Sequence, residues 1–325
     1  MPIHNLGYRE WSGPLESPSS RWTVVAGIGI RRAWQSAWLR RVMFFAWIPA
    51  VAMGFMIFLH ARAISDGGIS ARLVLSFADI LLKTEDRMAI GESIRGLPTS
   101  GPEDQEKLIK GQHQFWSSLL LILFQRTQVF LLVPIIGLIA PPLISQDVRS
   151  RAFLLYFSRP LSKTQYVLGK AATILTYTTI VTLLPGLLLY TVGVLLSQDL
   201  SILNYTWDLP LRIVAVTATI TVPSTLLALM FSSLTTESRY ASFAWFSVWI
   251  FGAATHAAML PFSTSETNVV IRSLSLYHLY RDVSGWLLDL NTTVTDIETR
   301  IIILLAITVI SFAILMRRIA APMKI

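Results

Sequence analysis

The chain has 325 residues, of which 53% are hydrophobic and only 14% are charged. With a mean hydropathy of +0.58, this composition indicates an integral membrane protein rather than a pair of soluble domains. The net charge of +8 does not call for a nucleic acid partner, because membrane proteins collect Lys and Arg on their cytoplasmic side. The lack of cysteine excludes disulfides, thiol nucleophiles and cysteine-ligated metals.

The N-terminal segment, residues 1–41, changes character at about residue 20. Its first part is polar, rich in Pro and Ser, and has no secretory signal. In its second part Trp34 and Trp38 stand four residues apart, and four arginines surround them: Arg31, Arg32, Arg40 and Arg41. Tryptophan and arginine mixed on one helix are typical of a helix that lies along the membrane interface. We therefore expect a cytoplasmic segment that ends in an interfacial helix.

Residues 42–325 contain six apolar stretches that can cross a bilayer as helices. They are residues 42–59, 129–144, 171–196, 211–234, 240–262 and 301–316. Pro185 and Pro223 lie inside two of them, where a proline is tolerated as a kink. Basic residues gather near both termini, in residues 145–170 and at Arg239, whereas residues 197–210 contain none. The positive-inside rule therefore places both termini in the cytoplasm of a six-span, all-α protein.

The longest segment outside these stretches is residues 61–126, between the first two spans. It has balanced charge and several Gly and Pro breaks, and residues 69–82 have the pattern of an amphipathic helix. With the N-terminus inside, this segment is an extracytoplasmic helical insert. We expect its apolar residues 115–124 to form a surface or re-entrant segment, with Arg126 at the outer interface.

Four residues are candidates for a transport pathway. Phe246, Trp249 and His256 lie in the fifth span, and Arg126 lies at the end of the insert. Aromatic side chains in a span can line an apolar pathway or face lipid. A histidine within the membrane can bind an ion or a proton, or it can bond to a neighbouring helix. The sequence pattern leaves these alternatives open.

Motifs for catalysis or nucleotide binding are missing from the sequence. The five histidines are scattered, with no pair at metal-ligand spacing, and there is no HExxH or GxSxG pattern. Gly169-Lys170 does not belong to a phosphate loop, because Thr164 stands where that loop needs a glycine. We therefore expect no enzyme activity and no bound cofactor or metal in this chain.

Residues 145–170, between the second and third spans, form a basic polar segment that carries large apolar side chains. Those at helical spacing are Phe153, Leu154, Tyr156 and Phe157. Pro160 then ends the short helix that this spacing predicts. Such a helix at a membrane surface can dock a partner. A solvated loop that only fixes the topology is an equally good interpretation.

Residues 141–170, PPLISQDVRSRAFLLYFSRPLSKTQYVLGK, resemble the cytoplasmic loop of ABC-2 type permeases, the membrane subunits of one group of ATP-binding-cassette exporters. That loop has an acid, a Leu-rich helix, a Ser-x-Pro-x-Ser-Arg/Lys motif and a Gly-Lys pair that opens the next span. The matching positions are Asp147, Leu154, Leu155, Ser158, Pro160, Ser162, Lys163, Gly169 and Lys170. Arg149-Ser150 replaces the Gly-Thr that usually follows the acid. Residues 273–287 also look like the outer segment of this family.

This resemblance implies a permease of the cell membrane that works as a homodimer or heterodimer with two copies of a separate ATPase subunit. ATP and Mg²⁺ would bind to that ATPase, since this chain has no nucleotide motif. Residues 145–170 would act as the coupling helix. The residues of the ATPase contact would be Asp147, Arg151, Phe153, Leu154, Tyr156, Phe157, Arg159 and Pro160.

Two other functions remain open at this stage. A lipid-modifying membrane enzyme would need ionisable residues at the membrane edge, for which Asp282, Asp289 and His278 are the candidates. A membrane anchor or sensor without transport activity would bind a ligand or a protein through residues 61–126.

Overall fold

The computed structural model describes residues 20–66, 68–81, 113, 115–124, 129–152, 161–197, 202–262, 273–288 and 296–320. These residues are almost entirely helical, and no β-strand occurs among them. Within the described ranges, five helical stretches are long and apolar enough to cross a membrane. They are Ala37–Ala63, Phe130–Arg149, Lys163–Leu196, Asp208–Leu234 and Ile297–Ala320. The prediction of an all-helical membrane protein with several spans is confirmed.

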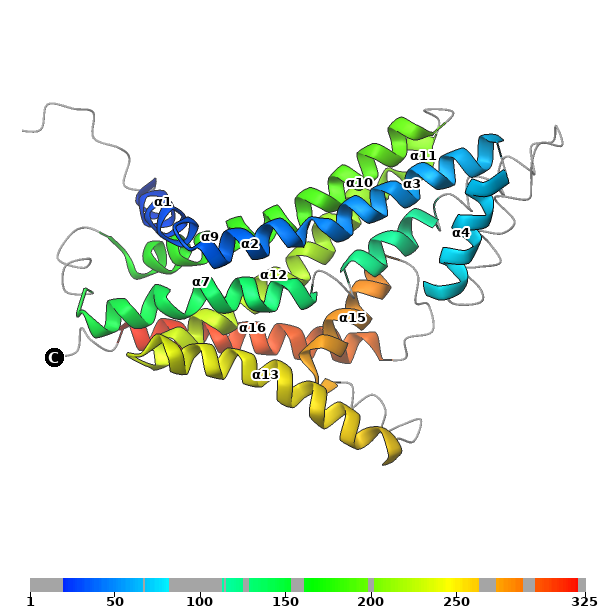
Figure 1. The fold of residues 1–325 in the computed structure, drawn as a ribbon. Helices are drawn as coiled ribbons and strands as arrows, with labels where there is room; N and C mark the ends of the chain where they lie inside the picture. The colour runs from blue at the N-terminus through cyan, green and yellow to red at the C-terminus, as the bar shows by residue number, and fades with distance from the viewer. Residues whose placement is uncertain are drawn as a thin grey trace, which may run out of the picture.

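The helices run, in chain order, as α1 (Arg21–Trp34), α2 (Ala37–Ala46), α3 (Ile48–Asp66), α4 (Gly68–Leu81), α7 (Val129–Arg149), α9 (Lys163–Val181), α10 (Leu183–Leu196), α11 (Ile202–Thr206), α12 (Asp208–Leu234), α13 (Ser238–Met259), α15 (Leu276–Leu287) and α16 (Ile297–Ala320). A 3-10 turn, Leu260–Phe262, follows α13. Figure 1 shows an elongated bundle in which α3 and α10 diverge from α13 toward one end. The central helix is α12, which packs against α7, α9, α10, α13, α15 and α16.

The fifth predicted span corresponds to α13, which has 22 residues. It is not among the five stretches that meet the criteria of length and hydropathy. Its tryptophans, serines and single histidine lower its mean hydropathy, although its length is that of a membrane crossing. The helix therefore agrees with the prediction in position, and its place in the membrane stays a prediction.

The first span is longer than the sequence predicts. Instead of ending near residue 59, α3 continues to Asp66. His60 is buried, and its ring stacks on Phe115 with the ring centroids 3.9 Å apart. Phe115 belongs to residues 115–124, most of which are fully buried. The side chains of residues 115–124 therefore pack against the bundle, and the placement of this segment at the membrane surface or as a re-entrant segment stays a prediction.

The third predicted span is divided into two helices at Thr182. Pro185 has no N–H to donate to the carbonyl of Val181, so one hydrogen bond of the helical ladder is lost there. Accordingly α9 ends at Val181 and α10 begins at Leu183. By contrast, α12 continues through Pro223 without interruption.

The helix α7 contains three prolines, of which Pro141 and Pro142 interrupt its ladder near the middle. Ser232, on α12, forms hydrogen bonds with the backbone of α7 at and just after these prolines. Its hydroxyl donates to the carbonyl of Pro141 at 2.6 Å and accepts from the backbone N–H groups of Ile144 and Ser145, both at 3.1 Å. Because buried backbone groups need partners, these hydrogen bonds fix α12 against this part of α7.

The predicted interfacial helix is divided between two helices, α1 and α2, because the chain turns at Gln35 and Ser36, and α2 is the start of the long apolar stretch Ala37–Ala63. Ser36 caps α2 by accepting from the backbone N–H of Leu39. The helix α1 lies on α9, where Tyr177 donates to the carbonyl of Ile30 at 2.7 Å. At Gly29 a Cβ would overlap the side chain of Thr173. The lack of a side chain at Gly29 therefore lets the two helices approach closely.

This close approach predicts different effects for two glycines of α1. Gly29→Ala should destabilise the protein by about 1–3 kcal/mol, because the new methyl group collides with Thr173. Gly27→Ala should be neutral or slightly stabilising, because a Cβ there meets nothing within 4 Å and alanine favours a helix. The melting temperatures of the purified variants measure this difference. Equal melting temperatures would contradict the packing of α1 on α9.

Candidate functional site

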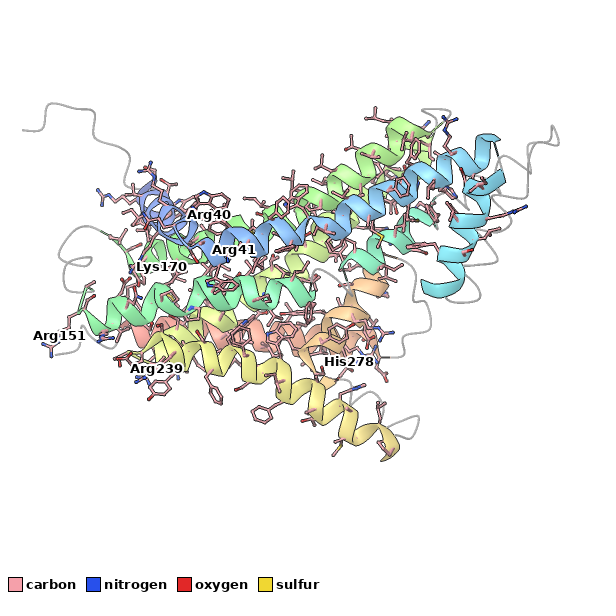
Figure 2. The ribbon with its side chains drawn as sticks, viewed as in Figure 1. Arg40, Arg41, Arg151, Lys170, Arg239 and His278 are labelled. Carbon is pink, nitrogen blue, oxygen red and sulfur yellow. The ribbon has the colours of Figure 1, made fainter. Side chains whose placement is uncertain are left out.

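Basic side chains gather at one end of the bundle. Figure 2 labels Arg40, Arg41, Arg151, Lys170 and Arg239 there, and it shows His278 well away from them. The same end holds α1, the end of α7, the start of α9 and the end of α16 (Figure 1). We call it the basic end. The two described parts of the segment 145–170, residues 145–152 and 161–170, both lie at this end. The segment therefore begins and ends at the basic end.

A buried ion pair joins α7 to α9 at the basic end. The Nζ of Lys170 lies 2.7 Å from the Oδ2 of Asp147, and both side chains are only 10% exposed. The hydroxyl of Tyr166 donates to the same Oδ2 at 2.7 Å. Burying one charge alone is strongly unfavourable, whereas a paired and hydrogen-bonded charge is tolerated. The Asp147–Lys170 pair therefore fixes the position of the end of α7 against the start of α9.

The start of α9 is set by a capping box. The hydroxyl of Ser162 accepts from the backbone N–H of Gln165 at 3.2 Å, and the Gln165 side chain accepts from the N–H of Ser162 at 3.0 Å. With α9 beginning at Lys163, Tyr166 and Lys170 lie four residues apart and share one face. That face is turned toward α7, so both side chains reach Asp147.

Gly169 and Lys170 serve two different neighbours. While Lys170 points to α7, Gly169 lies against α1. A Cβ at Gly169 would come within 2.6 Å of the Cβ of Val25 and 2.8 Å of the carbonyl oxygen of Trp22. The Gly-Lys pair thus provides a close helix contact on one side and a counterion for Asp147 on the other.

The end of α7 has a Schellman turn. The backbone N–H of Ala152 donates to the carbonyl of Asp147 at 2.9 Å, and that of Arg151 donates to the carbonyl of Val148 at 3.2 Å. Arg151 has a φ of 52°, in the left-handed region that favours glycine. Its side chain is exposed, as is that of Arg149, which pairs with Glu237 at 3.2 Å. The chain thus leaves α7 in a defined direction at the basic end.

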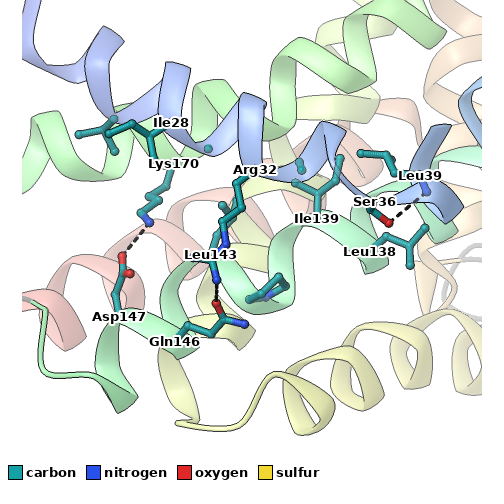
Figure 3. A pocket seen from close by; sticks show the side chains of 14 residues that line it. Ile28, Arg32, Ser36, Leu39, Leu138, Ile139, Leu143, Gln146, Asp147 and Lys170 are labelled. Carbon is teal, nitrogen blue, oxygen red and sulfur yellow. Dashed lines mark hydrogen bonds and ion pairs between the residues drawn. The ribbon is translucent and has the colours of Figure 1, made fainter.

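A cavity of about 250 Å³ lies beside the Asp147–Lys170 pair. Its walls come from α1, α2, α7 and the start of α9 (Figure 3). The guanidinium of Arg32 donates to the side-chain oxygen of Gln146 across this space. Four polar side chains, Arg32, Gln146, Asp147 and Lys170, therefore meet in a cavity that is otherwise mostly apolar.

Only part of the predicted partner contact falls within the described residues. Asp147 and Arg151 are placed as given above. Six other residues of that prediction lie outside the described ranges: Phe153, Leu154, Tyr156, Phe157, Arg159 and Pro160. The prediction that these six residues contact a partner is untested. The structure does describe how the residues on either side of them are held.

The candidate pathway residues do not meet at one place. Phe246 lies against α7, where its ring fills the space beside Gly137. Trp249 packs on Tyr280 of α15 with the ring centroids 6.1 Å apart, and His256 stacks on His278 of the same helix at 3.6 Å. The fourth candidate, Arg126, lies outside the described residues.

The residues considered for a membrane enzyme are engaged in other contacts or not described. Asp282 forms a buried ion pair with Arg300 of α16, at 3.0 Å. His278 stacks on His256, and Asp289 lies outside the described residues. Within the described part of the chain, no group of three or more His, Cys, Asp or Glu residues is arranged to hold a metal ion.

Sequence reasoning missed both buried ion pairs. The sequence marks Asp147 and Lys170 as motif positions and Asp282 as a candidate at the membrane edge, without partners. A signal is present for three of the four charges, because Asp147, Lys170 and Arg300 stand at the borders of apolar stretches, where an unpaired charge is unfavourable. In comparisons with known proteins, no family model and no curated protein matches the chain. The site is therefore interpreted from its own geometry.

The burial of the Asp147–Lys170 pair predicts a non-additive response to mutation. Lys170→Met should destabilise the protein by about 3–5 kcal/mol, because it leaves the carboxylate of Asp147 buried without a counterion. The double variant Asp147→Leu, Lys170→Met should recover much of this loss, since no buried charge remains. Thermal unfolding of the purified variants in detergent measures both effects.

The exposed pair of Arg149 and Glu237 provides the control. The Arg149 side chain is 67% exposed, so Arg149→Met should change the stability by less than about 1 kcal/mol. If Lys170→Met is as mild as Arg149→Met, the buried pair does not hold α7 and α9 together.

Proposed function

We propose that the chain is the membrane-spanning permease subunit of an ABC-2 type transporter, an exporter driven by a separate ATPase that docks on residues 145–170. The observation that carries this proposal is the Asp147–Lys170 pair with its hydrogen bond from Tyr166. It ties together the two borders of the segment that resembles the coupling loop of such permeases. The remaining motif positions at these borders also have defined tasks, since Ser162 caps α9 and Gly169 receives α1.

A loop whose two ends are held together in this way can transmit a force to the helices α7 and α9. If α7 and α9 were free to separate, a push on residues 153–160 would deform the loop rather than move the helices. The ion pair, the Schellman turn at Arg151 and the capping box at Ser162 oppose this deformation. Closure of two ATPase subunits would then tilt α7 and α9 together, with α1 following because it packs on α9.

In this proposal the basic end faces the cytoplasm, and α13 crosses the membrane as the fifth of six spans. Both termini are then cytoplasmic, and residues 61–126 are extracytoplasmic. The permease works as a dimer with itself or with a second permease in the cell membrane. ATP and Mg²⁺ bind to the two ATPase subunits, and this chain carries no catalytic residue.

The orientation can be tested with single cysteines, because the chain has none of its own. Ser162→Cys should be shielded from a membrane-impermeant thiol reagent added to intact cells, because it lies at the basic end, which faces the cytoplasm in this proposal. Ser201→Cys, in the loop without basic residues, should react. Labelling in intact cells, compared with labelling in permeabilised cells, measures the difference. Reaction of Ser162→Cys in intact cells would reverse the orientation.

The docking of the ATPase can be tested on the aromatic residues of the loop. Tyr156→Ala or Phe157→Ala should weaken docking by about 2 kcal/mol or more, close to thirtyfold in affinity, because a large aromatic anchor is lost. Arg151→Ala should matter much less, because an exposed charge at the rim contributes little affinity. Co-purification of the ATPase and its stimulated activity are the measurements. If both aromatic variants co-purify with the ATPase and stimulate it as the wild type does, residues 145–170 only fix the topology of the chain.

A further inference from the structure

We propose that the cavity between α1, α2, α7 and α9 binds one anionic phospholipid from the membrane leaflet at the basic end. The lipid phosphate would lie at Arg32, and the glycerol and the first acyl carbons would lie along Leu39 and Leu138. This site shares Asp147 with the predicted ATPase contact and is otherwise formed by different residues. It requires only that the chain spans a membrane with the basic end at one surface, so it does not depend on transport activity.

Polar and apolar side chains lie toward opposite ends of the cavity, as the polar and apolar parts of a phospholipid do. Figure 3 shows Arg32, Gln146, Asp147 and Lys170 toward one end of the cavity and Leu39, Leu138 and Ile139 toward the other. Along α7, Gln146 follows Leu138 by eight residues, which corresponds to about 12 Å at the helical rise of 1.5 Å per residue. The polar groups lie nearer to the basic end, and the apolar groups lie deeper in the bundle. A phospholipid in that leaflet has its phosphate and its acyl chains in this order.

The rim of the cavity carries exposed apolar side chains. Two of its lining residues, Ile28 on α1 and Leu138 on α7, are 64% and 41% exposed. Large apolar side chains exposed on a membrane protein are in contact with acyl chains. A phospholipid can therefore enter sideways between α1 and α7, while its tails remain in the bilayer.

The charges favour an anionic headgroup. Two cations, Arg32 and Lys170, and one anion, Asp147, line the cavity, so its net charge is positive. Because Lys170 is already neutralised by Asp147, Arg32 is the group that recognises the phosphate. A guanidinium binds a phosphate through two parallel hydrogen bonds. Its contact with Gln146 involves a neutral amide, and a charged phosphate forms the stronger hydrogen bond.

The size of the cavity is consistent with partial enclosure. At about 250 Å³ it has room for the phosphate and glycerol, whereas complete acyl chains do not fit. The helix α1 forms one wall and is held on α9 by the contact of Gly29 with Thr173. A bound lipid would contact α1 through its phosphate, and α2 and α7 through its glycerol and first acyl carbons.

The proposal is tested by quantifying bound lipid on the purified full-length chain. The protein is equilibrated with equal amounts of phosphatidylglycerol and phosphatidylcholine that have identical acyl chains, and retained lipid is measured by native mass spectrometry. We expect saturable retention of one phosphatidylglycerol per chain. Arg32→Gln should weaken this binding about tenfold. Arg31→Gln should change it less than about twofold, because Arg31 is a neighbouring exposed arginine that does not line the cavity.

Two further variants test the position of the lipid. Leu138→Trp and Ile28→Trp fill the cavity from opposite walls and should each reduce phosphatidylglycerol retention without removing a charge. Both replace exposed side chains, so at least one is expected to fold, as judged by its melting temperature. Wild-type retention in a folded filling variant would overturn the site.

Other outcomes would overturn the proposal in different ways. Equal losses of phosphatidylglycerol retention in Arg31→Gln and Arg32→Gln would indicate that the lipid is attracted to the basic surface in general and not to this cavity. Equal retention of the two lipids would remove the preference for an anionic headgroup. Displacement of phosphatidylglycerol by an equal concentration of glycerol 3-phosphate would indicate a site for soluble phosphates. None of these outcomes affects ATPase docking, which is measured separately.

Discussion

A carboxylate and an ammonium held at 2.7 Å, away from water, determine how the basic end is built. Neither Asp147 nor Lys170 can be buried alone, so α7 and α9 must meet where these two residues stand. Once that contact exists, Gln146 and Gly169 are placed as well, because they are adjacent in sequence. Gln146 then faces Arg32, and Gly169 faces α1. The ion pair thus helps to determine the shape of the cavity, the position of α1 and the positions of the two ends of the loop.

Those parts of the fold that depend on local sequence could be predicted. The long apolar stretches and the amphipathic helix α4 each have a signal within a few neighbouring residues. His60 shows where this reasoning ends. A histidine after an apolar stretch predicts the end of a span, but Phe115, far along the chain, covers it and lets α3 continue. Likewise Pro185 and Pro223 look alike in sequence, yet the helix divides only near Pro185.

The candidate site was only partly predictable for the same reason. Its motif positions were visible in the sequence, but their tasks depend on neighbours from distant segments. Gly169 was noted as half of a Gly-Lys pair, and its reason, the backbone of Trp22, becomes visible only when α1 lies on α9. Trp249 and His256 were considered together as pathway residues, and both proved to pack on α15. Contacts between distant segments leave no periodicity in either segment.

The hydroxyl of Ser232 has a consequence for how the bundle can rearrange. Three hydrogen bonds join this one group of α12 to the backbone of α7. Sliding α12 along α7 by even one residue would break these three hydrogen bonds, and only the carbonyl of Pro141 would keep another donor, the hydroxyl of Ser145. The three hydrogen bonds therefore oppose a change of register between these two helices.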